Sequence, residues 1–379
     1  MTEYVNGSAS ILFEAAFEHL TKTSKKAGEG LDKGKYKFFT SSSIQSKYSD
    51  SYDFEGPHLI FGTGGMPSIH YCNEKFSTST DCFVMKPKDN RLLPKYIYYF
   101  FKGNPEILGR GFRGSGLKHL SINYLNSVKL PKPPIETQKK IVLKLEKAEK
   151  LIKLREEADK LTDEFLKAVF YELFGNYLRN RNVFKNIKDF VSADKNAIKA
   201  GPFGSSLKKS MYVEKGYKIY GQEQVIRDDL DFGYYYISRE KYQELENYKI
   251  REDDILISLV GTYGKISIVP KNYQPGIINP RLMKITLDKQ KMDPIFFKFL
   301  FLSDIISVDL ENASHGGTMN IVNVNIVKKM GFPLPPLSLQ QKFAKIVKNT
   351  EKVKEKQKQT EVQITNFLNS ILQLAFKVN

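Results

Sequence analysis

The chain repeats its own pattern of residues once, about 200 residues further on, and this internal repeat restricts the possible folds more than any other feature. The motif G-T-x-G-x-x-S-I, a proline that opens an aromatic-rich segment, and a proline-rich run each occur twice and in the same order. Their first residues are Gly62 and Gly261, Pro94 and Pro294, and Pro131 and Pro333. Solenoid units of about 20–50 residues cannot fold singly, whereas a repeat of this length is as large as a domain. We therefore predict two halves that share one architecture.

Each half mixes two kinds of segment. Short apolar runs such as residues 36–39 and 255–259 are typical of strands, whereas residues 94–102 and 294–302 have the pattern of helices. The spacing of these segments is irregular, and a purely parallel sheet would need strand and helix to alternate regularly. We therefore predict the α+β fold class, with two similar mixed α/β domains. A length of 379 residues also favours more than one hydrophobic core.

Glycine and proline become rare after each proline-rich run, where Lys, Glu and Leu dominate. In both places residues recur at steps of three and four, the period of a coiled-coil seam. The first series is Ile141, Leu145, Ala148, Leu151, Leu154, Ala158, Leu161, Phe165 and Ala168. The second is Phe343, Ile346, Thr350, Val353, Gln357, Thr360, Ile364, Phe367, Ile371 and Leu374. Such a pattern also suits an ordinary packing or oligomerisation helix, but two copies that follow similar domains favour one antiparallel coiled coil of two long helices.

The start of the second long helix carries its own signal. Ser338 and Gln341 have the spacing of a capping box, in which the serine accepts a hydrogen bond from a free backbone N–H group and the glutamine reaches back. The preceding prolines cannot continue a helix backwards. We therefore expect Ser338 to cap this helix.

The repeat and the helices together predict the domain boundaries. The predicted divisions are residues 1–132 for the first domain, 133–182 for the first long helix, 183–334 for the second domain and 335–379 for the second long helix. Residues 1–17 do not align with the start of the second domain, so the start of the first domain stays open.

The charge of the chain indicates a polyanionic partner. The chain has 59 Lys and Arg against 42 Asp and Glu, a formal net charge of +17. It has no run of about 18 apolar residues and no signal-peptide pattern, so we favour nucleic acid over a membrane and predict a cytoplasmic protein. Cys72 and Cys82 have no partners at metal-ligand spacing, which favours two ordinary reduced cysteines over a disulfide framework or a zinc site.

Motifs expected of an enzyme that acts on nucleic acid are missing. The sequence has no phosphate-binding G-x-x-x-x-G-K-[ST] loop, and Pro133-Pro134 is followed by Ile135 instead of the aromatic residue of an amino-methyltransferase signature. No Glu-x-Lys follows Asp253-Asp254 at a distance that suits a nuclease. The glycines of residues 62–65 indicate a tight turn more than a cofactor loop. We therefore predict no catalytic site and no metal site.

Two proline-rich motifs carry a resemblance to a known family. The pattern Pro-x-Pro-Pro-apolar-x-x-Gln occurs at residues 131–138 and again at residues 333–340, each time before a long helical segment. Small polar loops precede the two motifs, at residues 114–120 and 316–320. This arrangement covers nearly the whole chain and resembles the specificity subunit of Type I DNA restriction-modification systems.

The resemblance implies two target-recognition domains, each of which reads one half of a bipartite DNA site. The paired helices would set the gap between the half-sites and dock methyltransferase subunits. The chain itself would be non-catalytic and without a cofactor, because S-adenosylmethionine, ATP and Mg belong to its partners, two methyltransferase subunits and two restriction subunits. One alternative is an autonomous DNA methyltransferase or nuclease fused to such domains. Another is a coiled-coil scaffold whose basicity is incidental.

Basic residues in glycine-rich, loop-like segments are the candidates for DNA contact, because phosphate contacts supply most of the affinity and base-edge contacts supply the sequence choice. The first-half candidates are Arg110, Arg113 and Lys118, and the second-half candidates are Lys208, Lys209, Tyr263 and Lys265. A solvated surface charge is the alternative for each lone Lys or Arg, since the 59 basic residues lie mostly at the surface.

Overall fold

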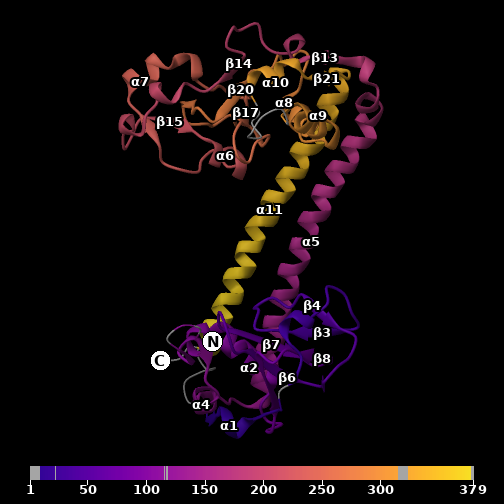
Figure 1. The fold of residues 1–379 in the computed structure, drawn as a ribbon, viewed down its shortest axis with the longest axis vertical. Helices are drawn as coiled ribbons and strands as arrows, with labels where there is room; N and C mark the ends of the chain where they lie inside the picture. The colour runs from indigo at the N-terminus through magenta and orange to yellow at the C-terminus, as the bar shows by residue number, and fades with distance from the viewer. Residues whose placement is uncertain (1–8, 22, 115, 117, 315–322, 377–379) are drawn as a thin grey trace. The chain divides into compact units, whose positions relative to one another are not determined.

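A computed structural model describes residues 9–21, 23–114, 116, 118–314 and 323–376. The described chain forms two compact units, unit 1 from residues 1–158 and 356–379 and unit 2 from residues 159–355 (Figure 1). Each unit contains part of both long helices, α5 (Ile135–Arg179) and α11 (Leu337–Phe376). No helix within the described residues is both long enough and apolar enough to cross a membrane. The polar loop at residues 316–320, which contributed to the resemblance, lies outside the described residues.

Unit 1 is built on two four-stranded sheets. Its strands and short helices are β1 (Ser10–Leu12), α1 (Phe13–Ala16), β2 (Phe17–His19), a 3₁₀ turn (Ala27–Glu29), β3 (Tyr36–Phe39), β4 (Lys47–Ser49), β5 (Phe54–Glu55), β6 (His58–Gly62), β7 (Ser68–Cys72), β8 (Lys75–Thr78), β9 (Cys82–Pro87), α2 (Pro94–Gly103), α3 (Pro105–Gly109), β10 (Phe112–Arg113), β11 (His119–Leu120), α4 (Ile122–Ser127) and β12 (Lys129–Pro131). One sheet has the antiparallel order β2-β9-β6-β7, and the other has the order β4-β3-β8-β5 with β3 parallel to β8.

Unit 2 follows the same plan. Its strands and short helices are β13 (Phe184–Asn186), β14 (Ile198–Ala200), β15 (Tyr217–Tyr220), α6 (Gln222–Arg227), β16 (Tyr236–Ile237), α7 (Arg239–Glu244), β17 (Ile255–Ser258), β18 (Ile266–Ile268), β19 (Gly276–Ile278), β20 (Leu282–Ile285), α8 (Pro294–Phe301), α9 (Asp304–Ser314), α10 (Val324–Lys329) and β21 (Gly331–Pro333). Five 3₁₀ turns lie at Arg181–Val183, Ile187–Asp189, Gly204–Ser206, Lys209–Met211 and Glu246–Tyr248. One sheet has the order β14-β20-β17-β18, and β16-β15-β19 forms a second, with β15 parallel to β19.

Strand pairing therefore confirms that the two halves share one architecture. In each unit the strand before the long helix pairs antiparallel with the first strand of the unit, β12 with β1 and β21 with β13. In each unit one parallel pair lies beside an antiparallel hairpin, β6-β7 or β17-β18. The α+β fold class is confirmed. The predicted domain boundaries at residues 132, 182 and 334 stay a prediction.

The two G-T-x-G-x-x-S-I motifs lie in corresponding hairpins but not in the same register. Gly62 is the last residue of β6 and pairs with Cys82, the first residue of β9. The corresponding strand of unit 2, β20, begins at Leu282, and Leu282 pairs with Ser258. Gly261 lies further along, in the turn, with a positive φ of 68°. The motif thus identified the right hairpins, but its residue-by-residue alignment is wrong.

An aromatic-rich helix packs against the strands of each unit. α2 starts at Pro94, and the ring of Phe101 meets that of Phe61 edge-on, with centroids 5.3 Å apart. α8 starts at Pro294, and the ring centroid of Phe297 lies 5.5 Å from that of Phe332. Proline suits the first turn because the N–H group that it lacks would have no partner there. Both predicted helices are confirmed.

A buried glutamine fixes the start of α5. Gln138 is fully buried, and its Oε1 accepts a hydrogen bond of 2.8 Å from the backbone N–H of Leu93, at the start of α2. Its Nε2 donates to the carbonyl oxygens of Arg91 (2.9 Å) and Pro133 (2.8 Å). One side chain therefore joins the proline run, the long helix and the aromatic-rich helix of unit 1.

Gln340 does the same in unit 2, and it replaces the expected capping box. Its Oε1 accepts from the N–H of Asp293 (2.9 Å), and its Nε2 donates to the carbonyl oxygens of Lys291 (3.0 Å) and Pro335 (2.8 Å). α11 already includes Ser338, so the expectation that Ser338 caps the helix is wrong. In both units the glutamine of the proline motif therefore acts as a tie, a buried side chain whose hydrogen bonds join the proline run, the long helix and the aromatic-rich helix.

The two long helices run antiparallel to each other within each unit. In unit 1 the beginning of α5 lies beside the end of α11, as shown by Ile141 and Ile371, which line the same cavity. In unit 2 the end of α5 lies beside the beginning of α11, where the ring centroid of Phe170 is 5.5 Å from that of Phe343. The predicted antiparallel pairing is confirmed.

The predicted seam residues of these helices are partly wrong. Leu154 and Leu161 are 48% and 64% exposed, and Phe367 is 55% exposed. After the buried Ala148, the better-covered side chains of α5 include Ile152, Arg155, Asp159, Thr162 and Leu166. These also follow steps of three and four, but several of them are polar. Of the predicted seam residues in this stretch, Ala158 is also partly covered. Apolar spacing selected the exposed leucines because they form a second, more apolar stripe on the same helix.

Candidate nucleic-acid interface

The parallel strand pair of each unit ends at an open hollow. In unit 1 the segments after β3 and β8 line a hollow of about 540 Å³, hollow 1, and in unit 2 the segments after β15 and β19 line one of about 670 Å³, hollow 2. The strand ends are held alike, because Ser79 N–H donates to Phe39 O and Asn279 N–H donates to Tyr220 O, both at 2.8 Å. Crevices at the carboxyl ends of adjacent parallel strands are common ligand sites.

Hollow 2 is lined largely by cations, amides and tyrosines. These residues include Lys209, Tyr212, Gln222, Arg227, Tyr235, Asn279 and Arg281. Arg227 pairs with Glu223 at 3.2 Å and stacks over Phe232, 4.2 Å from the ring centroid. Arg281 is exposed and forms no ion pair with a carboxylate of the described residues. Hollow 2 therefore offers an uncompensated positive charge to a ligand.

Some polar side chains around hollow 2 are held by hydrogen bonds within the protein, and others are not. Asn279 Oδ1 accepts a hydrogen bond of 2.9 Å from the backbone N–H of Arg281, which fixes the strand end that carries this arginine. Gln224 Oε1 accepts from the N–H of Gly221 at 3.0 Å. By contrast, Gln222 Oε1 is enclosed and has no partner among the described residues, which costs about 1–3 kcal/mol for a buried polar atom. The amide of Gln222 is thus uncommitted. Burial raises the pKa of Tyr212 above its usual range.

Hollow 1 is organised around Ser41. Ser41 Oγ donates to Asp81 O at 2.8 Å and accepts from the N–H of Gly64 at 3.3 Å. Ser41 O accepts from Ser68 Oγ at 3.0 Å. A Cβ at Gly62 would lie 2.2 Å from Ser68 Oγ and 2.8 Å from the backbone Cα of Ser41, so a larger residue would force the loop that carries Ser41 to shift. These contacts fix the loop after β3 against the β6-β7 turn. The remaining lining residues are Ser42, Ser43, Gly65, Met66, Lys118 and His119.

The predicted first-half residues lie in or near one ribbon of unit 1. Lys118 lines hollow 1, and Arg113 pairs with His119, another lining residue, in the β10-β11 ribbon. Arg110 lies at the end of α3, where its backbone N–H donates to Glu106 O at 3.0 Å. Of the three residues only Lys118 lines the hollow; Arg113 lies opposite a lining residue in the ribbon, and Arg110 lies at the end of α3.

The predicted second-half residues divide in the same way. Lys209 lines hollow 2, and Lys208 precedes it and is exposed. Tyr263 and Lys265 lie in the β17-β18 turn, where the side chain of Tyr263 packs against the core of unit 2 and Lys265 is exposed. DNA contact by any of these residues stays a prediction.

Sequence reasoning missed Gln222, Asn279 and Arg281 in unit 2 and the serines and Asp81 in unit 1. All of them lie one to four residues after the end of a strand, such as Tyr36–Phe39 or Gly276–Ile278. The available signal was their position at strand ends. A search centred on basic residues near glycines, with one tyrosine, could not find these acids, amides and serine hydroxyls.

Large exposed apolar side chains lie at or near both hollows. Met66, which lines hollow 1, is 80% exposed. Tyr235, which lines hollow 2, is 54% exposed, and its neighbour Tyr234 is 85% exposed. Exposed apolar groups beside polar ones are typical of interaction surfaces, and tyrosine combines an apolar ring with a polar tip.

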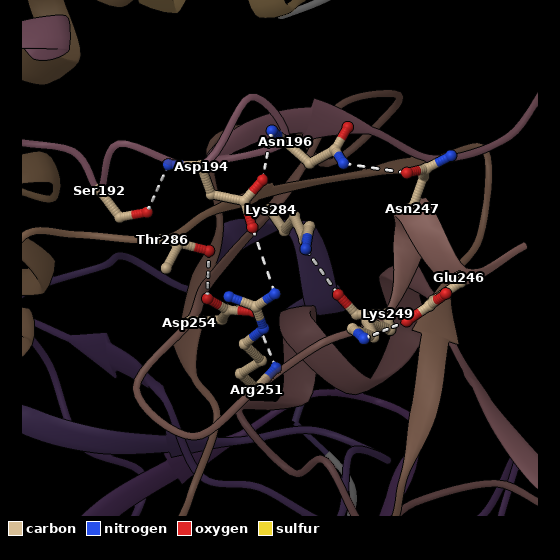
Figure 2. A network of polar contacts seen from close by, with 10 residues as sticks. All are labelled: Ser192, Asp194, Asn196, Glu246, Asn247, Lys249, Arg251, Asp254, Lys284 and Thr286. Carbon is tan, nitrogen blue, oxygen red and sulfur yellow. Dashed lines mark hydrogen bonds and ion pairs between the residues drawn. The ribbon is translucent and has the colours of Figure 1, made fainter.

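A separate polar network in unit 2 runs from exposed residues to a buried centre formed by Asp254 and Lys284 (Figure 2). Lys284 Nζ donates to Lys249 O at 2.6 Å, and Asp254 accepts from Thr286 Oγ1 at 2.5 Å and from the N–H of Arg251 at 2.8 Å. Burial raises the pKa of Asp254 and lowers that of Lys284. Both side chains are almost completely buried, so their hydrogen bonds serve the fold.

The carboxylate pair Asp253-Asp254 is divided between two environments. Asp253 pairs with Lys289 at 2.8 Å near the surface, while Asp254 belongs to the buried network. Across the part of the chain that the structure describes, no group of three or more His, Cys, Asp or Glu side chains could hold a metal ion. Cys72 and Cys82 are both buried.

The two halves each match one known domain family. Residues 12–161 and 183–366 match the family described as Type I restriction modification DNA specificity domain. The relatives include the Type I restriction enzyme MjaVIII specificity subunit of Methanocaldococcus jannaschii, which is 20% identical over 84% of this chain and 78% of that protein. They also include the Type I restriction enzyme EcoBI specificity subunit of Escherichia coli, 20% identical over 89% of this chain and 77% of that protein.

Two solved structures share the fold along almost the whole chain. The Type I restriction-modification S subunit of M. genitalium superposes with a TM-score of 0.63 at 16% identity, covering 99% of this chain and 98% of that one. A chain from a structure that concerns complex assembly and conformational transition of the type I R-M system superposes with a TM-score of 0.58 at 17% identity, with the same coverage.

Proposed function

The chain belongs to the Type I restriction modification DNA specificity family, and from this premise we propose that each of its two units reads one half of a bipartite target in double-stranded DNA. In this proposal the chain carries out no catalytic step. It recruits two methyltransferase subunits and two restriction subunits, which bind S-adenosylmethionine, ATP and Mg. The paired helices α5 and α11 set the gap between the half-sites.

The duplication of the unit is the observation that carries this proposal. Each unit has its own hydrophobic core and its own open hollow at the ends of a parallel strand pair. The linings of the two hollows differ chemically, as two half-sites of different sequence require. A net charge of +17 supplies the cations that phosphate contacts need.

An exposed apolar stripe on α5 supports the docking of partner subunits. Its members are Leu143, Leu151, Leu154, Leu161 and Phe165, each about half exposed. Stripes of this kind on a long helix cost solubility unless another surface covers them. We propose that the methyltransferase subunits cover this stripe.

The test of bipartite recognition is selection from random DNA. The full chain, alone and together with the methyltransferase subunit of its own cell, is incubated with duplexes that carry a randomised segment, and the bound DNA is sequenced. We expect two short conserved blocks at a constant gap. One continuous motif, or no enrichment, would contradict the proposal.

A second assay separates recognition from catalysis. The full chain alone is incubated with DNA, Mg²⁺ and S-adenosylmethionine, and strand cleavage and methyl transfer are measured. We expect neither without the partner subunits. Sustained turnover by the lone chain would favour the alternative, an autonomous methyltransferase or nuclease. Binding that does not weaken with added salt would favour a scaffold.

A further inference from the structure

We infer that Asp81 and Arg281 are specificity-determining residues, each of which selects a base in the half-site of its own unit. This inference rests on the proposed function. It assigns the two half-sites different chemistry: Asp81 selects a base that offers an amino group, and Arg281 selects guanine.

The two residues occupy the same position in the duplicated fold. Each lies between the two β-strands that border the hollow, β8 and β9 around Asp81 and β19 and β20 around Arg281. The carbonyl oxygen of Asp81 accepts from the N–H of Thr63 at 2.8 Å, and that of Arg281 accepts from the N–H of Leu259 at 3.0 Å. Thr63 and Leu259 directly follow the hairpin strands β6 and β17.

A second hydrogen bond is repeated as well. The backbone N–H of Asp81 donates to Ser79 Oγ at 3.3 Å, and that of Arg281 donates to Asn279 Oδ1 at 2.9 Å, in both cases to the side chain two residues earlier. The backbone at this position is therefore held on both sides in both units. What differs between the units is the side chain, which carries opposite charges.

Both side chains are available to a ligand. Asp81 and Arg281 are exposed and line hollow 1 and hollow 2. Neither forms an ion pair with a described residue, whereas many other exposed charges of the chain do, such as Lys37 with Glu74 at 3.2 Å. The protein does not use these two charges for its own stability.

Their opposite charges decide what each can do at DNA. A carboxylate that faces DNA repels phosphates, so an unpaired acid in such a hollow gains nothing from backbone contact and is useful only against a base edge. Carboxylates accept hydrogen bonds from the amino group of cytosine in the major groove. Arginine donates two parallel hydrogen bonds to O6 and N7 of guanine, the commonest specific contact to a base.

The neighbours of each residue fit the same assignment. Hollow 2 adds the uncommitted amide of Gln222, and a glutamine side chain can pair with adenine. Hollow 1 adds the exposed thioether of Met66, an apolar group that suits contact with a thymine methyl group. The two hollows are thus suited to different base sequences.

The test is a comparison of selected DNA motifs between variants of the full chain. Asp81→Asn keeps the shape of the side chain and removes its charge. Arg281→Ala removes the guanidinium, and Arg281→Lys keeps the charge without the two-pronged donor. Asp50→Asn and Lys271→Ala are charge-matched controls, because both residues are exposed and neither lines a hollow. Random duplex DNA is the probe, and circular dichroism checks that each variant is folded.

We expect each hollow variant to lose discrimination at one position of one half-site, by roughly 5- to 150-fold. Arg281→Ala and Arg281→Lys should relax the same half-site, Asp81→Asn should relax the other, and the controls should keep the wild-type motif. A uniform loss of affinity without a change of motif would overturn the inference, as would relaxation of the same half-site by both residues. If the wild-type chain itself selects no gapped motif, the result contradicts the proposed function, whereas the outcomes above contradict only the inference about Asp81 and Arg281.

Discussion

Replacing Gln340 by methionine tests whether the proline motif acts as a tie between elements. Methionine has nearly the same length and fills the site, so the change removes hydrogen bonds and leaves no large cavity. Three contacts disappear, to Asp293 N–H, Lys291 O and Pro335 O. The bond to Pro335 O is buried, and its unpaired carbonyl costs about 1–3 kcal/mol, while the two partly buried contacts add about 0.5–1.5 kcal/mol each. Gln340→Met should therefore destabilise unit 2 by about 2–6 kcal/mol.

Urea unfolding followed by circular dichroism and tyrosine fluorescence measures this loss. Two units can unfold in two transitions, so the matched variant Gln138→Met should destabilise the transition that Gln340→Met leaves unchanged. Gln341→Met, at the exposed neighbouring position, is the control and should change stability by less than about 0.5 kcal/mol. If Gln340→Met and Gln341→Met unfold at the same urea concentration, the tie is not a stabilising element and the reasoning fails.

Three further predictions concern acid, partners and salt. Hydrogen bonds from Arg91 and Lys132 hold the pKa of Asp89 well below its usual range, so its stabilisation is present above about pH 4 and is lost as the pH falls. Asp89→Asn should therefore lower the melting temperature at pH 7, and the difference from wild type should shrink below pH 4; a constant difference would refute this. Leu154→Asp and Leu161→Asp should abolish co-purification with a methyltransferase subunit while leaving the melting temperature within about 2 °C; retained co-purification at wild-type yield would exclude the α5 stripe as the docking surface. DNA affinity should fall linearly with salt on logarithmic axes, as titration by fluorescence anisotropy would show, and a flat line would exclude phosphate contacts.

The repeat made most of the fold predictable from the sequence. Helices that start at Pro94 and Pro294, strands at residues 36–39 and 255–258, and two long antiparallel helices all occur where the pattern placed them. These features depend on local preferences and on apolar periodicity, which a sequence displays directly.

The packed face of the long helices could not be predicted in the same way. α5 carries two stripes with nearly the same period, and the stripe with Leu154 and Leu161 is the more apolar. The helix nevertheless covers Arg155 and Thr162 better, because the position of the partner helix decides which side is enclosed. The spacing of apolar residues shows which stripe is more apolar, but it does not show which stripe faces the partner helix.

The candidate site was partly predictable for a similar reason. Lys118 and Lys209 were found because basic residues beside glycines are a local signal, and both line a hollow. Asp81 and Arg281 lie at strand ends that approach the hairpin through long-range hydrogen bonds. Their equivalence becomes visible only when both strand orders are known.

The division of the long helices between the units has a consequence for synthesis on the ribosome. Phe376, near the end of α11, is buried in the core of unit 1, where its ring centroid lies 5.0 Å from that of Tyr96 and its carbonyl oxygen accepts from Asn104 Nδ2 at 3.3 Å. Unit 2 ends at residue 355, so all of its residues leave the ribosome before Phe376 does. The unit whose strands are made first is therefore the last to close its core. Until then its unfinished apolar surface has to be kept from aggregating while the other unit is already able to fold.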